Sequence, residues 1–90
     1  MIHEITTNLA AGEIISRAKA FFAERVPNNA AYPEREGPTF LTLRGQGGEE
    51  IAFAVIPAPG GSRIRASTLF FDQAVQRFLS TLPEPVEVVG

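Results

Sequence analysis

The sequence predicts an α+β fold in which two helices pack on one face of an antiparallel sheet, in the order β-α-β-β-β-α. Three observations lead to this prediction. Residues 39–71 carry an unbroken β-pattern, which two glycine-rich turns divide into three strands. An amphipathic helical segment lies on either side of that pattern, and another strand-like segment precedes the first helix. Each helix has one apolar stripe that must be covered, so we expect both to pack on the apolar face of the sheet.

The first part of the chain predicts a strand and then a helix. Ile2–Leu9 is rich in Ile and Thr, which favour extended structure, and alternation places its odd-numbered residues on one face. Ala11–Val26 predicts a helix that ends before Pro27, with Glu13 and Arg17 at the i,i+4 spacing of an ion pair. The apolar stripe of this helix consists of Ile14, Ala18, Phe21, Phe22 and Val26.

Residues 28–38 contain two prolines and a glycine, so we expect a long irregular connection there. Three strands follow, at 39–44, 50–57 and 63–70. The turns between them, 45–48 and 58–61, are short and rich in glycine, which predicts an antiparallel meander. Alternation places these residues on the face that the helices would cover: Leu41, Leu43, Ile51, Phe53, Val55, Ile64, Ala66, Thr68 and Phe70.

Phe71–Leu82 predicts the second helix and has the clearest helical periodicity in the chain. Its stripe consists of Phe71, Ala74, Val75, Phe78, Leu79 and Leu82. Asp72 is placed to cap the helix N-terminus and to interact with its dipole, and Pro83 ends the helix. Residues 83–90 predict either a frayed tail or a final edge strand at Val86–Val89. We expect residues 1–90 to fold as a single domain.

The composition argues against several classes of function. The chain has no cysteine and a single histidine, His3, so we expect no metal site, no cofactor and no catalytic residues. His3 itself is expected to be a partly exposed strand residue. The net charge of −2 does not indicate nucleic-acid binding. No segment predicts a membrane span or a signal peptide, so we expect a cytoplasmic protein that does not bind membranes.

The order of elements resembles a shortened helix-grip domain, of the lipid-transfer and polyketide-cyclase-like group within the TATA-binding-protein-like architecture. Two parts of the chain carry the resemblance: the strand Ile2–Leu9 leading into its helix, and the strand-to-helix run Arg63–Leu79. Full helix-grip domains are longer, with more strands and a longer final helix around a cavity. The resemblance implies a binding module for a small apolar ligand.

The sheet face opposite the helices is more apolar than a face in water should be. Alternation places Phe40, Ala52, Ala54, Ile56 and Leu69 on this face. A covering loop, the C-terminal tail, a second subunit or a ligand would each explain it, and two-fold dimers are the commonest of these in small domains. We therefore predict a small, non-enzymatic binding or assembly module that forms a homodimer through this face.

Two alternative functions follow from other residues. Phe53, Phe70 and Phe71 could line a site for an apolar ligand beside the second helix, with Tyr32 as a lid. Arginines on the outer sheet face, together with Phe40, could instead bind single-stranded nucleic acid. For these arginines, Arg44, Arg63 and Arg65, we expect cross-strand ion pairing.

Overall fold

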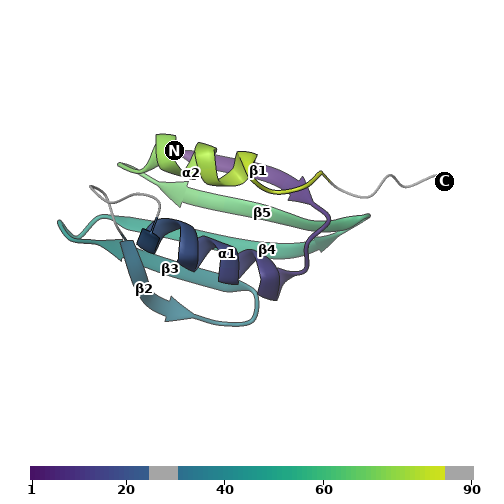
Figure 1. Ribbon diagram of the computed structural model, residues 1–90, viewed down its shortest axis with the longest axis horizontal. Coiled ribbons are helices and arrows are strands. Elements are labelled where there is room, and N and C mark those ends of the chain that lie inside the picture. Colours follow the sequence, from purple (N-terminus) through teal and green to yellow (C-terminus); the bar gives the residue numbers. More distant parts are fainter. Residues whose placement is uncertain (25–30, 85–90) are drawn as a thin grey trace.

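The computed structural model describes residues 1–24 and 31–84, which form a layer of sheet covered on one face by helices (Figure 1). The elements are β1 (Ile2–Thr7), α1 (Ala11–Glu24), β2 (Ala31–Glu36), β3 (Phe40–Gly45), β4 (Glu50–Ala58), β5 (Gly61–Thr68) and α2 (Asp72–Ser80). The five strands pair antiparallel in the order β1-β5-β4-β3-β2. The predicted fold class is therefore confirmed. Neither described helix has the length and apolar character needed to cross a membrane.

The strand β2 corrects the prediction of an irregular connection at 28–38. Ala31–Glu36 pairs with β3 and forms one edge of the sheet, although Pro33 lies within it. The register shifts between Pro33 and Arg35, which marks a β-bulge at this point. Proline is tolerated on an edge strand because it has no N–H to donate, and no neighbouring strand at the outer edge needs that donor. The predicted helical residues 25 and 26 and the predicted strand Val86–Val89 lie outside the described residues.

Glycine allows the β4–β5 hairpin to pass close to β1. Ala58 pairs with Gly61, so Pro59 and Gly60 alone connect the two strands. Gly61 has φ of 156°, and a Cβ atom there would lie 1.8 Å from the carbonyl oxygen of Thr7 at the end of β1. No other residue type fits this position, because a side chain would have to occupy the space of the β1 backbone.

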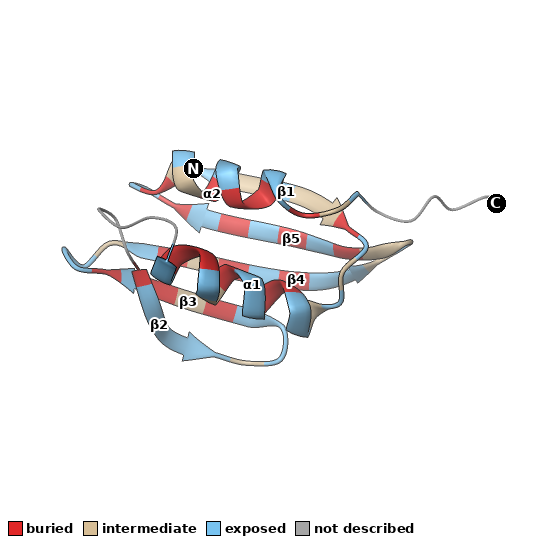
Figure 2. Cartoon of the chain, in the orientation of Figure 1, coloured by how far each residue is buried: buried red, intermediate tan, exposed pale blue. Residues whose placement is uncertain are grey.

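A cluster of phenylalanine rings joins both helices to the sheet. Phe22 of α1 is fully buried, and its ring centroid lies 6.0 Å from that of Phe53 on β4 and 6.0 Å from that of Phe78 on α2. Phe71, just before α2, lies 6.5 Å from Phe22 in an edge-to-face arrangement. Aromatic pairs at these separations attract each other beyond the effect of burial alone. Figure 2 shows buried stretches in both helices and in the central strands.

The junction between β5 and α2 differs from the sequence prediction at two residues. Phe70 was expected to face the helices, but β5 ends at Thr68 and the Phe70 residue is 76% exposed. The backbone N–H of Phe71 donates to Oγ1 of Thr68 at 3.2 Å, which turns the chain so that Phe71, not Phe70, enters the core. Asp72 was expected to cap α2, but it is the first helical residue and Phe71 occupies the N-cap position.

Replacement of Phe78 by alanine should lower the free energy of unfolding by about 3–5 kcal/mol, the usual cost of truncating a buried phenylalanine. Phe78 is 1% exposed, and its ring packs against those of Phe21, Phe22 and Phe53. Chemical denaturation measures the change. Phe70→Ala, at an exposed phenylalanine, is the matched control and should change stability by about 0.5 kcal/mol or less. Equal losses in the two variants would contradict the core assignment.

Candidate functional site

The outer face of the sheet is the largest candidate surface, because both helices lie on the other face (Figure 1). Strand register arranges its side chains in rows. Three rows cross the central strands: Thr42, Ala52, Ser67 and Ile2; then Phe40, Ala54, Arg65 and Glu4; then Ile56, Arg63 and Thr6. Small side chains therefore occupy the middle of the face, while larger apolar and charged ones surround them.

Several large apolar side chains on or beside this face are in contact with water. Phe40 is 42% exposed, Ile56 53% and Leu69, just beyond β5, 80%. The five residues predicted to form an interface are thus accessible, although Ala52 at the centre is half-buried. Ile2, which is 52% exposed, belongs to the same face and was not among the predicted residues. Alternation in β1 already placed Ile2 opposite the helix-facing residues, so this signal was present in the sequence.

Ion pairs order one end of the outer face. Nε and Nη2 of Arg44 donate to Oε2 of Glu34 at 2.9 and 2.8 Å, and Nη2 also donates to Oε2 of Glu50 at 3.2 Å. The hydrogen bond from Arg44 lowers the pKa of Glu34, and the same bond raises the pKa of Arg44. Cross-strand pairing, as predicted, is therefore confirmed for Arg44. These groups are exposed, so the pairs add little to stability.

The other two arginines on this face, Arg65 and Arg63, are less closely paired with carboxylates than Arg44. Nε of Arg65 lies 3.9 Å from Oε1 of Glu4, a loose ion pair across β5 and β1. Among the residues that the structure describes, Arg63 has no carboxylate within 4.0 Å. It lies beside Ile56, at the opposite end of β4 from Glu50.

A second cluster of polar groups joins β1 to the start of α2. Nε2 of His3 lies 2.8 Å from Oδ1 of Asp72, and the amino group of Met1 lies 3.6 Å from the same oxygen. The side chain of His3 is only 10% exposed, so the histidine is more enclosed than predicted and has a partner. The hydrogen bond from His3 lowers the pKa of Asp72, and the positive charge of Met1 acts in the same direction.

This pair holds a strand and a helix together and does not form a metal centre. In the described parts of the chain, no group of three or more His, Asp or Glu side chains is placed to hold a metal ion. His3 and Asp72 are separated by 69 positions in the sequence, so local patterns give no sign that they meet. The pairing of β1 with β5 brings His3 beside the segment that leads into α2.

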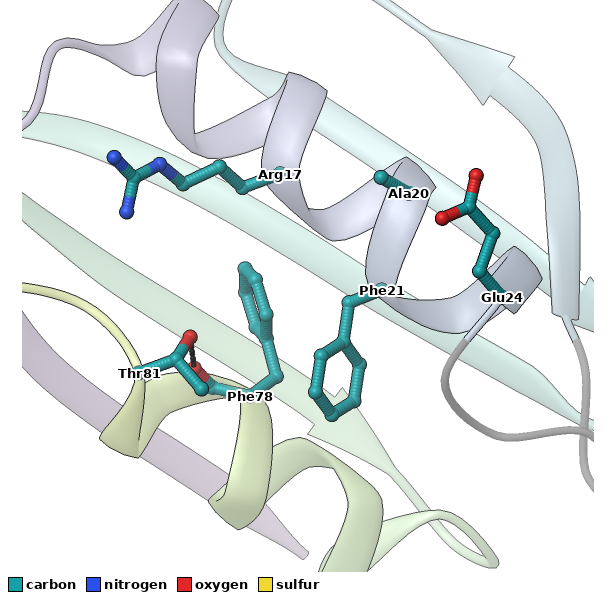
Figure 3. A pocket seen from close by; sticks show the side chains of 6 residues that line it. All are labelled: Arg17, Ala20, Phe21, Glu24, Phe78 and Thr81. Carbon is teal, nitrogen blue, oxygen red and sulfur yellow. Dashed lines mark hydrogen bonds between the residues drawn. The ribbon is translucent and has the colours of Figure 1, made fainter.

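An open groove of about 320 Å³ lies between the two helices (Figure 3). Phe21 and Phe78 point toward each other across it, with ring centroids 5.4 Å apart. Arg17 and Glu24 lie on the α1 side, and Thr81 lies on the α2 side, where its hydroxyl donates to the carbonyl of Phe78 at 2.6 Å. The groove is shallow because the two phenylalanines that form it are already packed in the core.

The four residues predicted to bind a ligand occupy different environments. Phe53 and Phe71 are buried in the core, where both contact Phe22. Tyr32 pairs with Arg44 on β2 and β3 and is half exposed, away from the helices. Phe70 and Phe71 line an open depression of about 390 Å³ with residues 47–49 of the β3–β4 turn. The structure thus brings together Phe70 and Phe71 at this depression and places Tyr32 on the outer face.

Comparison of the chain with family models, with curated proteins and with solved structures finds no match in any of the three.

Asp72→Asn should destabilise the protein at neutral pH, because the charged carboxylate accepts a bond from His3 and lies near the Met1 amino group. The pKa of Asp72 is lowered in the folded protein, so its contribution is fully present above the pKa of the unfolded chain. The contribution is lost as pH falls through the lowered value. Urea denaturation from pH 7 downward should therefore show parent and variant converging in acid.

The control for the Asp72 measurement is Glu24→Gln, which removes an exposed carboxylate. Its effect on the free energy of unfolding should be small at every pH, because exposed charges contribute little. A difference between the Asp72→Asn variant and the parent that stays constant down to strongly acid pH would show that the charge of Asp72 is not what stabilises the junction.

Proposed function

We propose that the protein is a small, non-enzymatic assembly module that forms a homodimer through the outer face of its sheet. One observation carries the proposal: three large apolar side chains on or beside this face, Phe40, Ile56 and Leu69, are 42–80% exposed around a floor of small residues. A protein that works as a monomer normally has polar side chains on a sheet face that contacts water. Face-to-face packing of two such sheets would remove the apolar side chains from water.

The position of β2 favours a second subunit over the 28–38 connection as the cover of the outer face. The connection at 28–38 was one of the candidates for covering the outer face. Its described part forms β2, which extends the sheet sideways at the edge of β3 and leaves the face open. We continue to expect that the proposed homodimer is cytoplasmic and has no cofactor.

The area of the face is sufficient for a dimer of moderate strength. Four strands about 4.8 Å apart and about seven residues long cover roughly 450 Å² of flat surface per copy. Protruding side chains raise the accessible area above the flat value. Two copies would therefore bury roughly 1,000 Å² or more, about the minimum expected of a biological interface. An interface of this size should dissociate on dilution.

Sedimentation or light scattering across a dilution series should show a monomer–dimer equilibrium. Ile56→Glu should weaken the dimer by at least about tenfold, because it replaces an apolar contact by a carboxylate that must lose its water at the interface, even when Arg63 beside it pairs with it. Phe70→Glu makes the same kind of change at an exposed apolar residue beyond the end of β5 and should leave the equilibrium unchanged. A parent protein that stays monomeric at high concentration would contradict the proposal.

We propose binding of a small apolar ligand as the second candidate, supported by the depression that Phe70 and Phe71 line with residues 47–49. An apolar ligand there would cover Phe70, whose exposure is otherwise unexplained. Native mass spectrometry of freshly purified protein should then show an added mass, and Phe70→Ser should remove it. Parent protein without added mass, and without response to a panel of fatty acids, would count against this candidate.

A further inference from the structure

We infer that the two sheets of the dimer stack with their strand ends reversed, so that Arg63 of each copy pairs with Glu50 of the other. The inference rests on the proposed dimer and adds to it the arrangement of the copies and the residues that select it. The observations behind it are the positions of these two residues on β5 and β4 and their unequal pairing within one copy.

Arg63 and Glu50 cannot pair within one copy. Arg63 lies opposite Ile56, six positions along β4 from Glu50, which corresponds to about 20 Å. Arg63 has no carboxylate within 4.0 Å among the described residues. Within residues 1–24 and 31–84, Glu50 pairs with Arg44, which donates two hydrogen bonds to Glu34 and one longer hydrogen bond to Glu50. At one end of the face, the guanidinium of Arg63 is therefore available to pair with a carboxylate. At the other end, the carboxylate of Glu50 can accept further hydrogen bonds.

Two-fold symmetry allows two aligned ways to stack this face on a copy of itself. In the first, the axis runs along the strands, so each row faces the same row of the partner, and Glu50 lies over Glu50 when the axis follows β4. In the second, the axis runs across the strands, between the rows of Ala52 and Ala54. Each end of the face then lies over the opposite end of the partner's face. Arg63 then lies one strand from the partner's Glu50, within reach of a long side chain.

The charges favour the second arrangement. In the first, Arg63 faces its own row, which contains Ile56 and Thr6 and no carboxylate. The second forms two equivalent Arg63–Glu50 pairs. Opposed like charges at an interface act against the wrong arrangement more strongly than a rim ion pair adds affinity. The second arrangement also places Ala52 over Ala54 of the partner, and these small side chains allow the sheets to approach closely. Arg65 keeps Glu4 beside it in either case.

Charge reversal tests the pairing directly. R63E and E50R should each weaken the homodimer by about tenfold or more at low ionic strength, because each variant has two repulsive contacts per dimer. An equimolar mixture of the two variants should recover dimerisation to within about threefold of the parent, because both contacts of the heterodimer become attractive. Native mass spectrometry distinguishes the heterodimer from the two homodimers by mass. Thermal unfolding of each variant checks that the fold is intact.

R77E is the matched control, because Arg77 is an exposed residue of α2 on the other side of the molecule. It changes the net charge as R63E does and should neither weaken the homodimer nor form a favoured heterodimer with E50R. If R63E has no effect, or if R63E and R77E act alike, the inferred arrangement is wrong while the proposed dimer stands. A parent protein that is monomeric throughout would instead overturn the dimer itself, and the inference with it.

Discussion

The packing of Phe22 is the interaction on which the rest of the structure depends. Its fully buried ring contacts α2 through Phe78, the sheet through Phe53 and the β5–α2 junction through Phe71. A domain of this size has room for one core, so most of its large apolar side chains must meet in one place. Both helices therefore pack on the same face of the sheet, and neither is left to cover the other face.

The exposed outer face follows from this constraint. Each strand of the β3–β5 meander presents one side to the phenylalanine cluster and the other to solvent, because successive side chains alternate. Phe40 and Ile56 on the solvent side do not contribute to the buried core. Their exposure has a physical explanation if another surface covers them, and the proposed second copy of the same face would be such a surface.

Polar contacts to β1 hold α2 in place at the start of the helix and just after its end. At the first end Asp72 bonds His3, and at the other the hydroxyl of Thr7 donates to the carbonyl of Pro83 at 2.6 Å. Thr7 is fully buried, and a buried hydroxyl without a partner would cost free energy. These contacts set the position of α2 beside α1, and hence the width of the groove above Phe21 and Phe78. Other ion pairs lie on the exposed surface of α1, where Arg17 pairs with Glu13 and Lys19 with Glu36.

The sequence alone determined the features that depend on neighbouring residues: the stripe of α2, the two hairpins and the apolar members of the outer face. Periodicity reveals these because a helix or strand repeats over a few positions. The tertiary structure decided the rest. Residues 31–36 become a strand only because the edge of β3 accepts them. Phe71 enters the core as predicted, whereas Phe70 is exposed because β5 ends at Thr68. The meeting of His3 with Asp72 depends on strand register between distant segments, which no local pattern encodes.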